Sequence, residues 1–458
     1  MGLKLLLVCG LALLMSIPAL FVFALLHDRT NRAEEVAGEV SQLSGGRQTF
    51  LGPVLAVPYR VPAEPSAEGK PEGRNSDGVL FVFPVEGSAV AGTQSEVRSR
   101  SLFKVPVYTA DLSFKAHFDL TGATDFVPPN ATVDWSRAEL VVGAADAKGA
   151  KSDIVIDAGG VRSLAVPAAT VSQVQLENSD GPRGVRFPPT ADAGQLRLFG
   201  APAPFATPNS RFDAAATMKF TGAQRLAVLP FAKTTTFDAQ GTWASPSFDG
   251  GFLPLTRSVT DKGFSAHWAV PFVARGVPAG GTSDAVASLG ATALGISFVE
   301  PANPYQSVAR SLKYALMFVG LVFLAYFLFE TMARRRVHPA QYVLIGLAQI
   351  IFYLLLLSIA EQVGFDLAFL ISAAATVGLI SAYAGWVFES RKQGFIALVA
   401  FSLLYALIYI LMRLEDFALL VGAVTSFAAI AAVMYFTRGI DWYGVTSGDL
   451  PATSEERV

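Results

Sequence analysis

The sequence is poor in cysteine and histidine, and this scarcity excludes several kinds of site. Its 458 residues include one cysteine, Cys9, so no disulfide can form within the chain. The four histidines, His27, His117, His267 and His338, show no spacing typical of a structural zinc site. The chain also lacks a Gly-x-Ser-x-Gly elbow, a Walker loop and a dinucleotide-binding fingerprint. We therefore predict no metal, no cofactor and no catalytic residue, and we favour a protein that is not an enzyme.

An excess of charge is also missing. The chain has 35 Lys and Arg against 37 Asp and Glu, a formal net charge of −2. Because nucleic-acid-binding proteins carry basic patches or stripes, we predict no nucleic-acid partner. Hydrophobic residues make up 52% of the chain and the mean hydropathy is +0.44, which is high for a soluble protein. These values favour the lipid bilayer as a partner.

Long apolar runs are what the sequence has in abundance. Six of them approach the ~20 residues that an α-helix needs to cross ~30 Å of hydrocarbon. They are Leu5–Leu26, Tyr314–Phe329, Tyr342–Ile359, Leu367–Phe388, Phe395–Met412 and Phe417–Phe436. A cleaved signal peptide is the alternative for the first run, but its apolar stretch exceeds the usual ~7–15 residues, which favours an uncleaved anchor.

Positive charges near the ends of these runs predict the orientation. The loops after the second, fourth and sixth runs contain Arg334–Arg336, Arg391–Lys392 and Arg438. Because Lys and Arg in short loops mark the cytoplasmic side, we predict that both termini are cytoplasmic and that residues 27–311 lie outside. Arg29, Arg32, Arg310 and Lys313 run against this rule.

The predicted fold class is a membrane protein with six transmembrane α-helices, arranged 1 + 5. A large extracytoplasmic, mostly-β domain is inserted between the first and second helix. The predicted parts are an anchor (1–26), the outer β-rich domain (27–311), a five-helix bundle (312–437) and a cytoplasmic tail (438–458).

Alternating apolar and polar residues predict half-buried strands in the outer domain. The clearest are Leu112–Leu120, Phe212–Phe220 and Phe264–Phe272. Further candidates are Val79–Val85, Leu102–Thr109, Val171–Leu176, Leu196–Phe199, Thr235–Trp243 and Leu294–Val299. A short helix is predicted over residues 30–43. Many strands and little helical signal favour an antiparallel sandwich, or two stacked ones.

Some features of this domain have two interpretations. Pro62–Gly78 is predicted as a polar loop, and Ala201–Asn209 as a weak boundary that leaves one lobe or two open. Pro106 suggests an edge strand or a bulge, because proline cannot donate to a β-ladder.

Trp243 and Phe248 form either an exposed aromatic platform or a packed corner, and we favour the corner. His117 and His267 occupy polar positions of strands, where a solvated or hydrogen-bonded histidine is the ordinary case.

The membrane runs contain no ionised residue near their centres, which argues against a proton-coupled pump. Gln349 is their most polar interior residue, and we expect it to hydrogen-bond between helices. Small residues along the fourth run predict close helix packing. They are Ser372, Ala373, Ala375, Gly378, Ala382 and Gly385.

Several longer motifs follow one another along the chain. They are Gly52–Tyr59, Ser101–Tyr108, Trp243–Phe248 with Gly251–Pro254, Gly263–Trp268, Phe298–Pro301, His338–Tyr342 and Glu361–Phe365. With the 1 + 5 helices, these stretches resemble the CreD family of inner-membrane proteins, also called cell envelope integrity proteins. The resemblance runs from residue 1 to about residue 445.

The resemblance implies a bacterial multi-pass inner-membrane protein with a periplasmic domain, linked to envelope stress and the response to β-lactams. It supplies no catalytic residue, ligand or site. The favoured function is non-enzymatic, with the periplasmic domain binding or scaffolding a protein or cell-wall partner. The alternatives are a transporter or lipid-handling protein that uses the bundle, and an envelope hydrolase or transferase with unidentified carboxylates. The sequence leaves the oligomeric state open.

Overall fold

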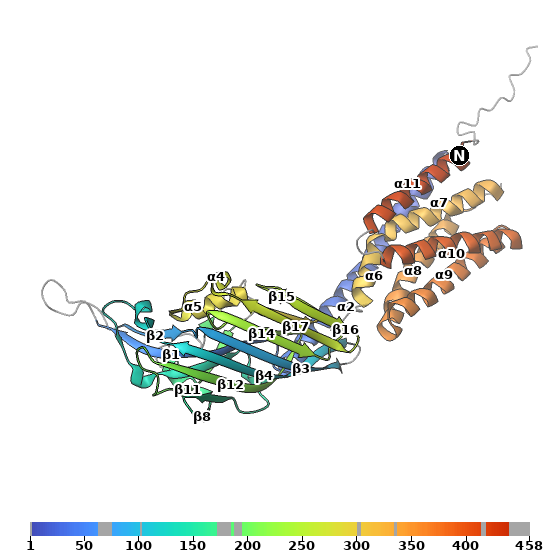
Figure 1. The fold of residues 1–458 in the computed structure, drawn as a ribbon. Coiled ribbons are helices and arrows are strands. Elements are labelled where there is room, and N and C mark those ends of the chain that lie inside the picture. Colours follow the sequence, from blue (N-terminus) through green and yellow to red (C-terminus); the bar gives the residue numbers. More distant parts are fainter. Residues whose placement is uncertain are drawn as a thin grey trace, which may run out of the picture. The chain divides into compact units, whose positions relative to one another are not determined.

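The computed structural model describes residues 2–62, 76–100, 103–171, 185–186, 195–299, 304–333, 337–413 and 418–438. The chain divides into two compact units, which are coloured by sequence in Figure 1. We call Met1–Ala33 with Ala302–Val458 the helical unit, and Glu34–Pro301 the β unit. The predicted helix at 30–43 is observed, but it continues the preceding helix without a break, as part of α2 (Ser16–Leu43).

The β unit contains two sheets. The eight-stranded sheet has the order β16 (Thr256–Thr260), β17 (Gly263–Val270), β14 (Thr234–Gly241), β3 (Glu86–Arg100), β4 (Phe103–Asp119), β12 (Arg211–Ala223), β7 (Val155–Ala158) and β8 (Val161–Leu164). The central path of the eleven-stranded sheet is β10 (Val185–Arg186), β11 (Gln195–Pro202), β6 (Glu139–Ala144), β1 (Gln48–Val61), β13 (Arg225–Val228), β19 (Leu294–Phe298) and β15 (Pro246–Gly250). Beside it pair β2 (Ser76–Val82), β5 (Thr132–Val133), β9 (Val166–Pro167) and β18 (Gly280–Gly281). The β unit also contains two short helices, α4 (Phe272–Arg275) and α5 (Ser283–Ser288).

The two sheets pack face to face around one hydrophobic core. Phe50 on β1 meets Phe220 on β12 edge to face, with 5.3 Å between the ring centroids. Tyr108 on β4 stacks on Phe298 of β19 at 4.7 Å. Such aromatic pairs stabilise a core by about 0.5–1.5 kcal/mol beyond the burial of their surface. The mostly-β sandwich is therefore confirmed.

Two strand pairs depart from the predicted antiparallel arrangement. β14 pairs with β3 in parallel, and β1 pairs with β13 in parallel. Parallel neighbours need a long crossover rather than a tight hairpin. More than 130 residues separate the ends of β3 and β14 along the chain, so the connection easily provides one.

Most predicted strands are observed, several with changed boundaries. The runs Leu102–Thr109 and Leu112–Leu120 belong to one long strand, β4. The run Val79–Val85 ends at Val82, and the run Phe264–Phe272 ends early because Pro271 stops β17 and Phe272 begins α4.

Two further predictions are partly wrong. In the predicted loop Pro62–Gly78, Ser76–Gly78 lie in β2, and in the predicted strand Val171–Leu176 the first residue is helical. Pro62 is exposed and outside regular structure, and residues 63–75 and 172–176 lie outside the described residues.

Pro106 lies in β4, an interior strand rather than the predicted edge strand, and the pairing of β4 with β3 runs through it without a bulge. The paired part of β12 ends opposite Val107, so β12 has no residue opposite Pro106. Gln224 N–H instead donates to Pro106 O at 3.2 Å. Trp243 Nε1 donates to Ser245 O and Val299 O, both at 3.1 Å. Trp243 and Phe248 both pack against the core, which confirms the packed corner.

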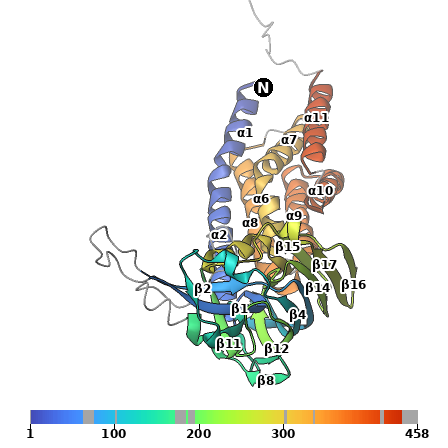
Figure 2. The same ribbon diagram turned by 60° about the vertical axis from the view of Figure 1, so that its left-hand side comes forward.

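The helical unit contains α1 (Gly2–Leu14), the start of α2, α6 (Pro304–Lys313), α7 (Ala315–Ala333), α8 (Pro339–Val363), α9 (Phe365–Val387), α10 (Arg391–Arg413) and α11 (Ala418–Thr437) (Figure 2). Within the described residues, four helical stretches are long and apolar enough to cross a membrane. There are five if α6 and α7, bent by 54°, form one span. The predicted total of six remains a prediction.

Some of the small residues on α9 are buried against neighbouring helices, and others are exposed. Ser372 and Ala373 are buried, and a Cβ on Gly394 of α10 would lie 3.1 Å from Gly385 Cα. Close packing is therefore confirmed at these positions. It is wrong for the exposed Ala375, Gly378 and Ala382, which point away from the neighbouring described helices.

Candidate binding surface

The candidate site lies on the outer face of the eight-stranded sheet. Strand residues alternate between the two faces of a sheet, and in β3, β4, β12 and β14 the apolar set faces the core. The residues between them on each strand are mostly polar or small, and their side chains point to the other, exposed face of the sheet. We call this the outer face.

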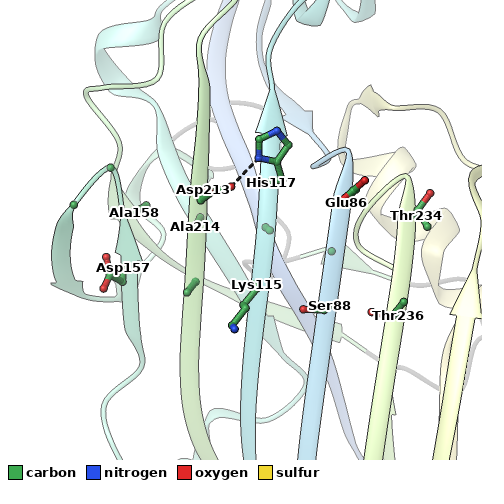
Figure 3. Close-up of a pocket in the computed structure, with 15 residues that line it drawn as sticks. Glu86, Ser88, Lys115, His117, Asp157, Ala158, Asp213, Ala214, Thr234 and Thr236 are labelled. Atoms are coloured by element: carbon green, nitrogen blue, oxygen red, sulfur yellow. Dashed lines mark hydrogen bonds and ion pairs between the residues drawn. The ribbon is translucent and has the colours of Figure 1, made fainter.

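Strand register brings distant polar residues into rows on this face. Thr234, Glu86, His117 and Asp213 stand opposite one another on β14, β3, β4 and β12. The next row on the same face runs Thr236, Ser88, Lys115, Ala215 and Asp157, ending on β7. Figure 3 shows Lys115 between Asp157 on one side and Ser88 on the other.

The two rows border a hollow of about 650 Å³, which lies in the usual size range of ligand pockets. Glycines and alanines, with short hydroxyl side chains, make up most of its floor. The complete lining is Glu86, Gly87, Ser88, Lys115, Ala116, His117, Asp157, Ala158, Gly159, Gly160, Asp213, Ala214, Ala215, Thr234 and Thr236. We call this space the charged hollow.

His117 is fixed at the rim of the charged hollow by its neighbour. Its Nδ1 lies 2.7 Å from Asp213 Oδ1, and both side chains are exposed, at 48% and 86%. A cross-strand carboxylate therefore orients the imidazole ring. The arrangement confirms a hydrogen-bonded histidine at a polar strand position.

His267 repeats this pairing elsewhere on the outer face. Its Nδ1 lies 2.7 Å from Asp238 Oδ1 on the neighbouring strand β14. A smaller hollow of about 400 Å³ adjoins this pair and includes Arg257 and Gln240 in its lining. Both histidines thus belong to surface ion pairs or hydrogen bonds across strands.

Metal chemistry finds no support on this face. Among the described residues, no group of three or more His, Cys, Asp or Glu side chains could hold a metal ion. That the chain has no catalytic and no metal-binding residue stays a prediction, and the geometry shows an exposed polar surface. Sequence reasoning did not nominate the charged hollow, because alternation gives the face of each residue but not its cross-strand neighbour.

The interior of the helical unit is polar at one predicted position. Gln349 is 3% exposed and lies beside Tyr405 of α10, and its Oε1 has no hydrogen-bond partner among the described residues. The expected hydrogen bond between helices therefore stays a prediction. At the end of α8, Tyr305 Oη donates to Glu361 Oε1 at 3.0 Å, which ties α6 to the bundle. Gln306 and Lys313, also on α6, are exposed.

Comparison with known proteins identifies the family. The profile of the family described as "Inner membrane protein CreD" matches residues 1–443. The chain belongs to the CreD family. Inner membrane protein CreD of Escherichia coli K12 is 29% identical over 451 residues, which cover 97% of this chain and 94% of that protein. This CreD-family chain is accordingly an inner-membrane protein with apolar helices and a large mostly-β region.

Solved structures add little to the family assignment. A candidate nutrient-binding protein from Legionella pneumophila covers 78% of this chain and 99% of its own, at 7% identity and a TM-score of 0.23. An M1 zinc metallopeptidase from Deinococcus radiodurans covers 78% and 94%, at 9% identity and a TM-score of 0.21. TM-scores this low carry no argument about fold or function.

Proposed function

We propose that this CreD-family protein is a non-enzymatic contributor to cell envelope integrity, acting through its β unit as a periplasmic binding domain. The observation that carries the proposal is the outer face, where an extended polar surface surrounds the charged hollow. A large sheet face usually packs against another layer or faces solvent. Here it presents charges of both signs over a floor of small residues, which suits recognition of a hydrophilic partner.

The proposal also assigns an orientation and a stress response. Both termini lie in the cytoplasm and the β unit lies in the periplasm, as the loop charges favour. Loss of the protein then weakens survival in detergent and in a β-lactam, because the periplasmic partner is no longer held at the membrane.

A truncation experiment tests which unit acts. A strain that lacks the protein is complemented with the full chain or with residues 1–301, and survival in detergent and in a β-lactam is measured. The cut at 301 keeps the β unit whole, whereas a cut at 311 would pass through α6. Restored survival with residues 1–301 supports the proposal. If only the full chain restores survival while the truncated protein accumulates normally, the helical unit is active and the proposal fails.

A surface variant tests the face itself. Lys115→Met removes the one lysine of the charged hollow, and Lys219→Met removes a lysine of the same outer face outside it. We expect the first variant to lower survival and the second to leave it unchanged. Equal survival of both variants and the wild type would remove the support for this face.

A further inference from the structure

Three charged residues of the charged hollow have no partner among the described residues, unlike their neighbours on the same face. Lys219 pairs with Asp111 at 3.2 Å, and Arg211 pairs with Asp119 at 2.8 Å, both across β4 and β12. Glu86, Lys115 and Asp157 make no ion pair or side-chain hydrogen bond with any described residue. Arg162 stands opposite Asp157 on β8, but no ion pair joins them and Arg162 does not line the hollow. These three charges are therefore available to a ligand.

Register fixes the order of these charges. Lys115 shares a row with Asp157 two strands away, and it lies one strand and one same-face step from Glu86. With strands ~4.8 Å apart and same-face residues ~6.8 Å apart, Lys115 is about 10 Å from Asp157 and about 8 Å from Glu86 between Cα positions. A positive charge thus stands between two negative ones.

The lining also limits the chemistry of a ligand. None of the residues that line the hollow is Phe, Tyr, Trp or a large aliphatic residue, and the one ring is the imidazole of His117. An acyl chain would bury little apolar surface there and would gain little from binding. A neutral sugar would leave the three charges without a counter-charge. The hollow instead suits a hydrophilic ligand that carries both signs of charge.

We propose that the charged hollow binds a short zwitterionic peptide, with its free carboxylate at Lys115 and its free ammonium at Asp157 or Glu86. An extended chain spans at most ~3.3–3.6 Å per residue, so a separation of about 8–10 Å corresponds to roughly three residues. Hydroxyls of Ser88, Thr234 and Thr236 lie on the Glu86 side of Lys115 and can hydrogen-bond to peptide groups there, whereas Ala215 lies between Lys115 and Asp157. This inference rests on the proposed function of the β unit as a binding domain.

Binding to the full chain in detergent tests the ligand class. Tri-alanine is titrated by calorimetry and compared with N-acetyl-tri-alanine amide, which has the same length without terminal charges. Two ion pairs at exposed side chains, each of up to ~1 kcal/mol, correspond to at most about thirtyfold tighter binding of the free tripeptide. We also expect that preference to shrink at high salt, since ion pairs near the surface are screened. Equal binding of the two peptides, or binding of neither, would overturn the proposal.

Variants then locate the site. Lys115→Met should lower the preference for the free tripeptide several-fold, because one of the two ion pairs is lost, and so should Asp157→Asn or Glu86→Gln, whichever carboxylate meets the ammonium. Lys219→Met is the matched control and should retain it. Retention of the full preference in Lys115→Met, or its loss in Lys219→Met, would place binding elsewhere and contradict the site.

The same variants separate this inference from the proposed function. If tri-alanine does not bind but Lys115→Met still fails to restore survival, the outer face is functional and the peptide class is wrong. If tri-alanine binds at Lys115 but all variants restore full survival, the site exists and the proposed function of the face is wrong.

Discussion

Arg225 and Asp249 form an ion pair that crosses over a glycine. Arg225 Nη2 and Nε each lie 2.8 Å from Asp249 Oδ1, and the Arg225 side chain is only 6% exposed. The two residues belong to β13 and β15, and β19 runs between them. A Cβ on Gly295 of β19 would lie 2.1 Å from Asp249 Oδ1, so only glycine leaves room for this pair.

Breaking this ion pair should destabilise the β unit strongly. Asp249→Ala leaves the Arg225 guanidinium buried without its carboxylate, and loss of one partner of a buried pair costs about 3–5 kcal/mol. Because Asp249 retains 33% exposure, we expect the lower end of that range. Denaturant unfolding of the full chain in detergent measures the change. Asp111→Ala, which breaks an exposed pair with Lys219, is the control and should cost less than about 1 kcal/mol. Similar losses in the two variants would contradict the assigned importance of burial.

Gln48 should hold the end of α2 in place. Its Nε2 donates to Gly45 O at 2.7 Å and to Asp146 O at 2.9 Å, and its Oε1 accepts from Asp146 N at 3.2 Å. Gln48→Leu leaves these backbone groups unsatisfied, at about 1–3 kcal/mol for each buried group. We therefore expect a lower unfolding temperature and faster proteolysis near residue 45. Gln94→Leu, an exposed glutamine on β3, is the comparison and should change neither. Unchanged proteolysis in Gln48→Leu would mean that the helix end is held by other contacts.

Asp119 should make the stability of the β unit depend on acid pH. Hydrogen bonds from Thr121, followed by the neighbouring Arg211, lower the pKa of Asp119 from 3.8 to about 2. Because the folded state binds this proton less tightly, the stabilisation is present above about pH 4 and is lost as the pH falls toward 2. The difference in unfolding temperature between the wild type and Asp119→Asn should therefore be positive at pH 6 and shrink between pH 4 and pH 2. A difference that stays constant over this range would refute the ionic origin.

Helix packing in the helical unit can be tested with two glycines. At Gly394 an added Cβ would meet Gly385 Cα at 3.1 Å and Ser381 O at 3.3 Å, whereas at Gly378 it would meet nothing within 4 Å. Gly394→Leu should separate α9 from α10 and lower the unfolding temperature in detergent. Gly378→Leu, on the exposed side of α9, should have little effect. The reverse order of the two effects would show that Gly378 is covered by a partner helix.

Local patterns in the sequence were sufficient for part of this structure. Alternation in Leu112–Leu120 indicated which residues face the core, because successive strand side chains point to opposite faces. Apolar length indicated the helices, because a membrane span needs a set number of residues. These signals depend on neighbours along the chain, so they can be read without a tertiary structure.

Other features required contacts between distant segments. The fusion of two predicted strands into β4 depends on pairing with the neighbouring strands β3 and β12. The parallel pairs, the row of Glu86, His117 and Asp213, and the ion pair over Gly295 depend on strand order and register.

The sequence by itself determined that the chain has several apolar helices and a large mostly-β region, and which side chains of the clearest strands face the core. Only the tertiary structure decided which polar residues meet on the outer face. The physical reason is that a shift of register changes every cross-strand neighbour, so alternation constrains the face of a side chain and leaves its partner to the packing of the whole sheet.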